Sequence, residues 1–159
     1  MEEIVVKMKS NALYFAAALL AVSMCAAASV VINEIEVNPP EGGVNWLEIY
    51  NPDNESVDIS GWTAEIVDGS WVGKFDVAPN ATILPSRGFY VFTGLPSWNH
   101  NDGGYAVLYS ASGEEVDRSA SRQDTMNNDF TYGRNPDGYD TNSDGDWGLS
   151  AGSKGSSNA

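Results

Sequence analysis

The sequence predicts an all-β domain, an antiparallel β-sandwich of immunoglobulin-like type, preceded by an N-terminal signal peptide helix. Short apolar or alternating runs recur along the chain, and each is bounded by Gly, Pro, Asn or Asp. This spacing is typical of a sandwich or barrel. No segment after residue 28 has a convincing helical pattern, and about seven strands with short connections match the immunoglobulin-like arrangement.

The first 28 residues have the organisation of an export signal. Lys7 and Lys9 precede an apolar run over residues 12–22, and Ala26–Ala28 follow it. This is the order of a basic region, an apolar region and a cleavage site. The run is shorter than the roughly 20 residues of a membrane-spanning helix. We therefore expect a signal peptide over 1–28 and a secreted or cell-surface domain over 29–159. An uncleaved N-terminal membrane anchor is the alternative.

The predicted mature domain is strongly acidic. The formal charge of the chain is −14, and residues 1–28 contribute two acids and two bases, which cancel. A surface of this sign repels phosphate backbones, so we do not expect nucleic acid as a partner. Cations, basic proteins and uncharged glycans fit better. The only cysteine, Cys25, would leave with the signal peptide, so we expect no disulfide.

Seven strands are predicted in the mature domain, in alternating or apolar runs between turn residues. They are expected over 30–37, 45–50, 62–67, 71–77, 88–92, 105–109 and 114–117. The sequence Asp68-Gly69 predicts a tight hairpin between the third and fourth, because both residues tolerate positive φ. Residues 110–113 contain Ser and Gly and predict the turn between the last two.

From Asp117 onward the composition shifts to Ser, Asn, Asp, Gly and Arg. This part of the chain is interpreted either as an ordered coil or as a flexible one. Its scattered aromatic residues favour packing back along the sandwich. Residues 152–159 are expected to be frayed, as chain ends often are.

Six short segments, in order, resemble the lamin tail domain family. They are VINEI at 31–35, WLEIYN at 46–51, VDISGW at 57–62, ILP to GFYV at 83–91, DGGYAVLY to GEEVD at 102–117, and YGRNPDG at 132–138 with Trp147 and residues 152–158. The resemblance implies an immunoglobulin-like β-sandwich. This family occurs in nuclear lamins and in exported microbial proteins, where it often accompanies nucleases or other enzymes. The sequence departs from the nuclear lamins in lacking a coiled-coil rod, and from the microbial fusions in lacking a catalytic partner domain. We therefore expect neither filament assembly nor enzymatic activity.

Few residues offer catalytic chemistry. His100 is the only histidine, and no nucleophile motif accompanies it. Glu34 and Glu48 lie on predicted strands, so a paired-carboxylate hydrolase is one interpretation. The favoured interpretation is structural: the acids accept hydrogen bonds from the backbone or from Arg134, whose planar fork suits carboxylates. We expect a protein that is not an enzyme.

One segment resembles the start of a calcium loop. Asp140, Asn142 and Asp144 provide oxygens at its first, third and fifth positions, and Gly145 stands at the sixth. Ala151 occupies the twelfth position, where an EF-hand has glutamate, so Asp137, Asp146 or a water molecule would have to complete a Ca²⁺ site. The alternative is a solvated loop stabilised by Asx turns.

The aromatic residues and the acidity predict binding rather than catalysis. Trp62 is expected in the core, whereas Trp71 and Trp98 beside loops are the candidate contact residues. The predicted function is a non-catalytic module of the cell envelope or extracellular space that contacts protein or glycan, with or without Ca²⁺. The alternative is an accessory domain or subunit of an extracellular hydrolase. Self-association through an exposed edge strand is a further possibility.

Overall fold

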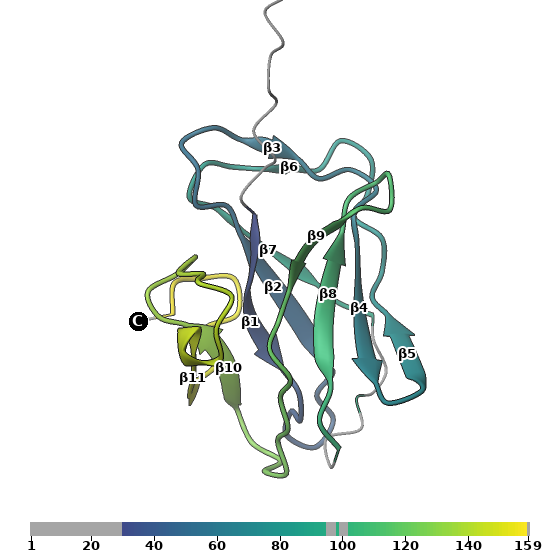
Figure 1. Ribbon diagram of the computed structural model, residues 1–159, viewed down its shortest axis with the longest axis vertical. Helices are drawn as coiled ribbons and strands as arrows, with labels where there is room; N and C mark the ends of the chain where they lie inside the picture. The colour runs from purple at the N-terminus through teal and green to yellow at the C-terminus, as the bar shows by residue number, and fades with distance from the viewer. Residues whose placement is uncertain (1–29, 95–97, 99–101, 159) are drawn as a thin grey trace, which may run out of the picture.

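The protein is a two-sheet antiparallel β-sandwich (Figure 1). The structure, a computed structural model, describes residues 30–94, 98 and 102–158. The predicted signal peptide, with Cys25, and the histidine His100 lie outside these residues, so the expectations about them stay predictions. No helix in the described part of the chain is long and apolar enough to cross a membrane.

The described residues contain eleven strands and one short 3₁₀ helix, joined by turns and loops. They are β1 Val31–Glu36, β2 Trp46–Tyr50, β3 Val57–Asp58, β4 Thr63–Asp68, β5 Trp71–Lys74, β6 Ile83–Leu84, β7 Phe89–Phe92, β8 Tyr105–Tyr109, β9 Glu115–Arg118, β10 Phe130–Arg134, the 3₁₀ helix Asp144–Asp146 and β11 Trp147–Ala151. The five-stranded sheet has the order β11-β10-β1-β2-β7, and the four-stranded sheet has the order β5-β4-β8-β9. The short pair β3-β6 lies at one end of the sandwich (Figure 1).

The all-β immunoglobulin-like prediction is confirmed, and each of the seven predicted strands is present. Four strands were missed for physical reasons. Strands β3 and β6 have two residues each, which is too short for a periodic pattern. Strands β10 and β11 each contain a glycine, which weakens a strand pattern, and they lie in a segment rich in Ser, Asn, Asp and Gly, so they were interpreted as coil. They nevertheless pair with each other, and β10 pairs with β1, so the chain after residue 117 is largely ordered.

The core lies between the two sheets and is built from their inward-facing aliphatic residues. Trp62 belongs to it, as predicted. A register shift between Ile32 and Glu34 lets both Ile32 and Ile35 reach the core, although strict alternation would place them on opposite faces. The bulge therefore brings the glutamates of β1 onto the outer face of the five-stranded sheet.

The β4–β5 hairpin turns one residue later than predicted. Asp68 pairs with Trp71, so Gly69 and Ser70 form the turn, and Gly69 has φ 59°. A glycine with positive φ at the first turn position suits a two-residue hairpin. As a consequence Asp68 is the last residue of β4, and it pairs with Trp71, the first residue of the edge strand β5.

Candidate functional site

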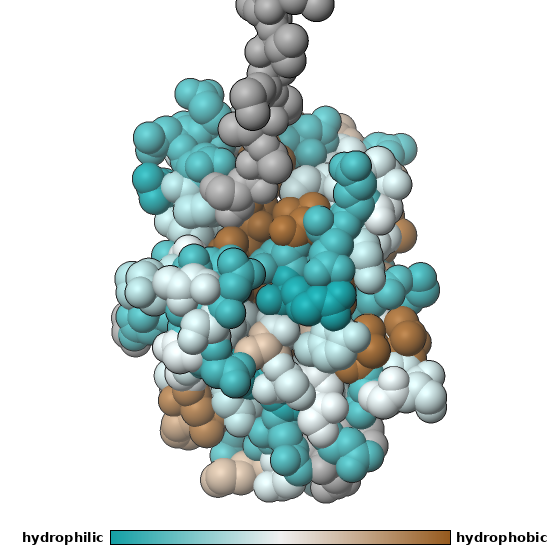
Figure 2. Space-filling model, in the orientation of Figure 1, coloured by the Kyte–Doolittle hydropathy of each residue, from teal (hydrophilic) through white to brown (hydrophobic). Residues whose placement is uncertain are grey.

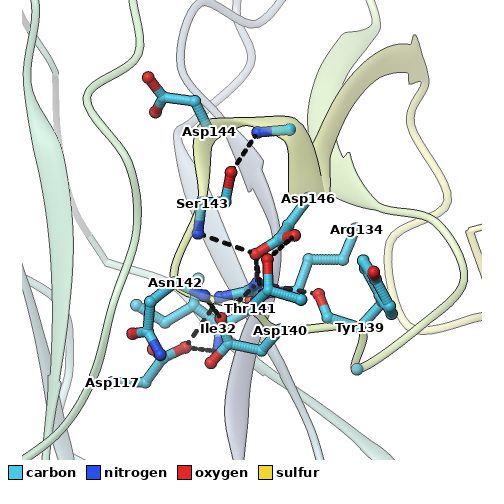
Figure 3. A network of polar contacts seen from close by, with 12 residues as sticks. Ile32, Asp117, Arg134, Tyr139, Asp140, Thr141, Asn142, Ser143, Asp144 and Asp146 are labelled. Carbon is cyan, nitrogen blue, oxygen red and sulfur yellow. Dashed lines mark hydrogen bonds and ion pairs between the residues drawn. The ribbon is translucent and has the colours of Figure 1, made fainter.

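Arg134, the last residue of β10, is the centre of a buried ionic cluster (Figure 3). Its guanidinium is 1% exposed. Nη1 lies 3.0 Å from Asp140 Oδ1 and 3.5 Å from Asp146 Oδ2, and Nη2 lies 3.4 Å from Asp117 Oδ2. We refer to these four residues as the Arg134 cluster. It joins β9 of the four-stranded sheet to β10 and to the loop that precedes β11.

Further contacts hold the guanidinium in one orientation. Nε donates to the carbonyl of Ile32 at 2.8 Å, and Nη1 donates to the carbonyl of Tyr139 at 2.9 Å. The guanidinium carbon lies 4.6 Å from the centroid of the Trp147 ring, which is a cation–π distance. Because a buried charge is costly without partners, this set of acceptors is what allows Arg134 to be buried.

The predicted calcium loop is organised by the Arg134 cluster. Asp146 accepts hydrogen bonds from Thr141 N, Thr141 Oγ1 and Ser143 N. Burial opposes ionisation of Asp146, but the hydrogen bonds from Thr141 and Ser143 outweigh it, so its pKa lies below the usual value. Asp140 Oδ1 receives both Arg134 Nη1 and Asn142 N.

The four predicted calcium ligands do not converge on one point. Asp140 and Asp146 face Arg134, whereas the Asp144 side chain is 85% exposed and points away from the cluster (Figure 3). In the part of the chain that the structure describes, no group of three or more His, Cys, Asp or Glu side chains is placed to hold a metal ion. The residues present therefore fit the guanidinium better than Ca²⁺, and Ca²⁺ binding stays a prediction.

Calcium binding can be tested by thermal unfolding. We expect the same melting temperature in EDTA and in millimolar Ca²⁺, because the inward carboxylates of Asp140 and Asp146 already pair with Arg134. An ion that binds only the folded state raises the melting temperature. A rise of several degrees that the substitution Asp144→Asn removes would therefore contradict this expectation and support an ion site in the loop.

Glu34 and Glu48 stand opposite each other on β1 and β2, and both side chains are fully buried. Glu34 accepts from Thr131 Oγ1 at 2.5 Å and from Ser153 N at 2.9 Å. Glu48 accepts from Asn33 Nδ2 at 3.1 Å and from Gly155 N at 2.6 Å. The backbone partners confirm part of the structural interpretation. The expected partner Arg134 is wrong, because it contacts three aspartates instead.

Residues 153–158 cover this pair of glutamates, so the prediction of a frayed C-terminal segment is wrong for them. Asn158 is buried, and its Nδ2 donates to the carbonyls of Asn33 and Arg134 at 3.1 and 2.9 Å. A Cβ atom at Gly133 would lie 2.7 Å from that Nδ2, so the glycine makes room for the side chain. The paired carboxylates are therefore closed to a substrate by the chain itself.

Burial also raises the pKa values of two glutamates on the outer face. The pKa of Glu48 is raised to about 7 by burial, which outweighs the hydrogen bonds from Asn33 and Gly155. Burial likewise raises the pKa of Glu36 to about 7, with smaller contributions from the charges of nearby acids. Both values lie well above that of an exposed glutamate.

These raised pKa values predict that the domain loses stability as the pH rises. A carboxyl whose pKa is raised on folding contributes stability that is present below about pH 4.5 and is lost as the pH rises through about 7. From pH 5 to pH 8 we expect the free energy of unfolding to fall by about 2–3 kcal/mol per group. Urea unfolding at a series of pH values measures this. Glu48→Gln should remove about half of this pH dependence, because Glu36 remains, and the exposed Glu114→Gln should leave it unchanged.

A hollow of about 450 Å³ lies at the β4–β5 hairpin. It is lined by Asp68, Gly69, Ser70, Trp71, Asp102 and Gly103. Trp71 is 39% exposed, as expected for a contact residue. Asp68 is buried, and its Oδ2 has no hydrogen-bond partner among the described residues. The lining of the hollow thus includes both an exposed aromatic ring and a buried carboxylate oxygen that has no donor among the described residues.

Trp98 differs from the prediction, because it is 3% exposed and belongs to the core. A Cβ atom at Gly104 would lie 2.7 Å from Trp98 Nε1, so this glycine allows the indole to pack against the start of β8. Of the two predicted contact residues, the structure therefore presents only Trp71 on the surface.

The fold agrees with a comparison against protein families. The Lamin Tail Domain family model matches residues 24–123, which is more than half of the chain. No curated protein matches the chain. The match ends before β10 and β11, although β10 completes the five-stranded sheet beside β1 and carries Arg134. An immunoglobulin-like module of this kind is consistent with a non-catalytic role. The chain belongs to the lamin tail domain family.

Proposed function

We propose that the protein is a non-catalytic exported module that binds an uncharged glycan at the β4–β5 hairpin. The observation that carries the proposal is the hollow lined by Trp71 and Asp68, where Asp68 Oδ2 lacks a hydrogen-bond donor among the described residues. An unsatisfied buried acceptor is costly, and a sugar hydroxyl supplies the missing donor. The apolar face of the Trp71 ring offers a surface for the C–H face of a sugar.

The charge of the protein supports a neutral ligand. The net charge is −14, so polyanions such as nucleic acid and acidic polysaccharides are repelled. Carboxylates and hydroxyls around the hollow suit a ligand that donates many hydrogen bonds, as a neutral sugar does. A protein segment that inserts an apolar residue beside Trp71 is the alternative occupant.

A catalytic role finds less support in the described residues. A paired-carboxylate hydrolase needs its two acids open to substrate and water. Glu34 and Glu48 are instead fully buried under residues 153–158 and hydrogen-bonded to them. The role of accessory domain for an extracellular hydrolase stays open, and it is compatible with glycan binding by this hairpin.

Isothermal titration against a panel of neutral oligosaccharides tests the proposal. We expect Trp71→Ala to weaken binding at least tenfold, because it removes the exposed aromatic ring that lines the hollow. Asp68→Asn should weaken it less, because an amide keeps one acceptor oxygen. Tyr139→Ala is the matched control, since Tyr139 is an exposed aromatic residue elsewhere on the surface. Equal loss in the Trp71 and Tyr139 variants would contradict the proposed site.

A further inference from the structure

A second, smaller hollow lies beside strand β11. Its volume is about 130 Å³, and it is lined by Asp124, Met126, Asn128, Phe130 and Leu149. Met126, Phe130 and Leu149 are each about half exposed or more, which is unusual for large apolar side chains of a small acidic domain. Figure 2 shows a hydrophobic patch in the region of β10 and β11. Phe130 is the first residue of β10, and Leu149 lies within β11.

A buried carboxylate forms part of this apolar hollow. Asp124 is only 7% exposed, and its Oδ1 accepts a hydrogen bond from Met126 N at 2.7 Å. Its Oδ2 has no hydrogen-bond partner, and no ion pair in the described residues involves Asp124. Asp124 and Asp129 both raise the pKa of Glu36, which shows that these three acids lie near one another. The hollow therefore combines apolar walls with an unneutralised negative charge.

The hollow lies beside a sheet edge that can accept another strand. Strand β11 is an edge strand of the five-stranded sheet, with β10 as its neighbour. Gly152 N donates to the carbonyl of Asp129, so these two residues form a hydrogen-bonded pair. Hydrogen-bonded and non-hydrogen-bonded pairs alternate along an antiparallel ladder. Leu149 and its partner Tyr132 are therefore a non-hydrogen-bonded pair, and the backbone N–H and C=O groups of Leu149 point away from β10. The sequence of β11, WGLSA, contains no charged residue and no proline. It thus lacks the charged side chains and prolines that usually prevent an exposed edge strand from pairing with another chain.

We propose that this corner binds an extended segment of a partner protein, which pairs with β11 and places a lysine or arginine side chain in the Asp124 hollow. The aliphatic stem of such a side chain packs on Met126, Phe130 and Leu149, and its cationic head approaches Asp124 Oδ2. Strand addition at an edge supplies main-chain hydrogen bonds, and the pocket supplies specificity. This contact is separate from the glycan site, which lies on the other sheet.

Two other occupants fit the corner less well. A second copy of this chain, paired through its own β11, would bring no lysine or arginine from that strand to the hollow. A divalent metal ion needs several oxygen ligands, and the described residues contain no group of three or more acidic or histidine ligands placed for one. The carboxylate and the apolar walls together match an aliphatic cation.

Fluorescence anisotropy with a short peptide tests this inference. The probe is a labelled peptide of alternating valine and threonine with one central lysine, and its partner probe has norleucine at that position. We expect the lysine peptide to bind at least tenfold more tightly than the norleucine peptide. Asp124→Asn should remove this difference. Glu114→Gln should keep it, because it removes one exposed acid from the β8–β9 turn of the other sheet.

Thermal unfolding separates a binding residue from a structural one. Because Asp124 Oδ2 has no partner and lies near other acids, we expect Asp124→Asn to keep or raise the melting temperature. Leu149→Lys should also block the peptide, since it places a cation of the chain itself at the hollow. The inference is overturned if the lysine peptide does not bind the wild-type protein, or if Asp124→Asn lowers stability while the preference for lysine persists. Concentration-dependent dimerisation that the peptide leaves unchanged would likewise assign the edge to a second copy.

Discussion

Replacement of Arg134 by alanine is expected to lower the free energy of unfolding by about 3–5 kcal/mol, more than any other single substitution considered. The guanidinium contacts Asp117, Asp140 and Asp146, and the side chains of Asp117 and Asp146 are buried together with it. Without the guanidinium, these three carboxylates would lose the cation that lies between them and would repel one another. The loop before β11 would also lose the group that positions it. Urea unfolding at pH 7 measures the change.

A matched control separates the buried ion pairs from ordinary surface pairs. Arg118 pairs with Glu115 at 2.7 Å, but both side chains are 43% exposed. Exposed pairs contribute about 0–1 kcal/mol, so we expect Arg118→Ala to change stability little. Similar losses for the two variants would contradict a structural role of the Arg134 cluster. Arg134→Lys should be intermediate, because an ammonium keeps the charge but not the planar fork.

Substitution of Asn158 by alanine has the second largest expected effect. Its side chain donates to the carbonyls of Asn33 and Arg134 and accepts from Ser153 Oγ. Its removal leaves buried carbonyl groups without donors, which costs about 1–3 kcal/mol for each group. We expect a loss of about 2–4 kcal/mol in the free energy of unfolding, together with faster amide hydrogen exchange at Ser153 and Gly155.

Lys154→Ala serves as the control for this prediction. Lys154 lies in the same segment, but its side chain is exposed and only approaches the Trp46 ring at 5.4 Å. It should therefore change stability and exchange little. If Asn158→Ala proved equally mild, residues 153–158 would not be held in place as the structure shows. Glu34 and Glu48 would then be open to solvent, and the paired-carboxylate interpretation would need to be considered again.

The strands that could be predicted from sequence alone share one property: each is marked by a pattern within its own few residues. Strands β1, β2, β4 and β8 contain alternating or continuous apolar residues between turn residues, and this pattern is visible within a few positions. Strand β10 pairs with β1 across about a hundred residues of sequence, and its own residues FTYGR show no such pattern. Pairing of this kind depends on tertiary context more than on intrinsic propensity.

The same distinction explains the outcome for the site residues. The spacing of Asp140, Asn142 and Asp144 is local, and it matched the start of a calcium loop. The residue that organises that loop, Arg134, acts through contacts with Ile32 and Asp117, which lie 102 and 17 positions away. Trp71 could be recognised because a hairpin turn follows Asp68. The unpartnered oxygens of Asp68 and Asp124 gave no sequence signal, because the lack of a partner is a property of the folded surroundings.

The most direct test of the proposed role is one assay that measures binding and cleavage together. The purified protein is incubated with insoluble neutral polysaccharides, and both the protein bound to the pellet and the reducing ends released into solution are measured. The account predicts that one or more polysaccharides retain the protein, that Trp71→Ala abolishes retention, and that no reducing ends appear. Release of reducing ends that Glu48→Gln abolishes would contradict it and would establish a hydrolase instead.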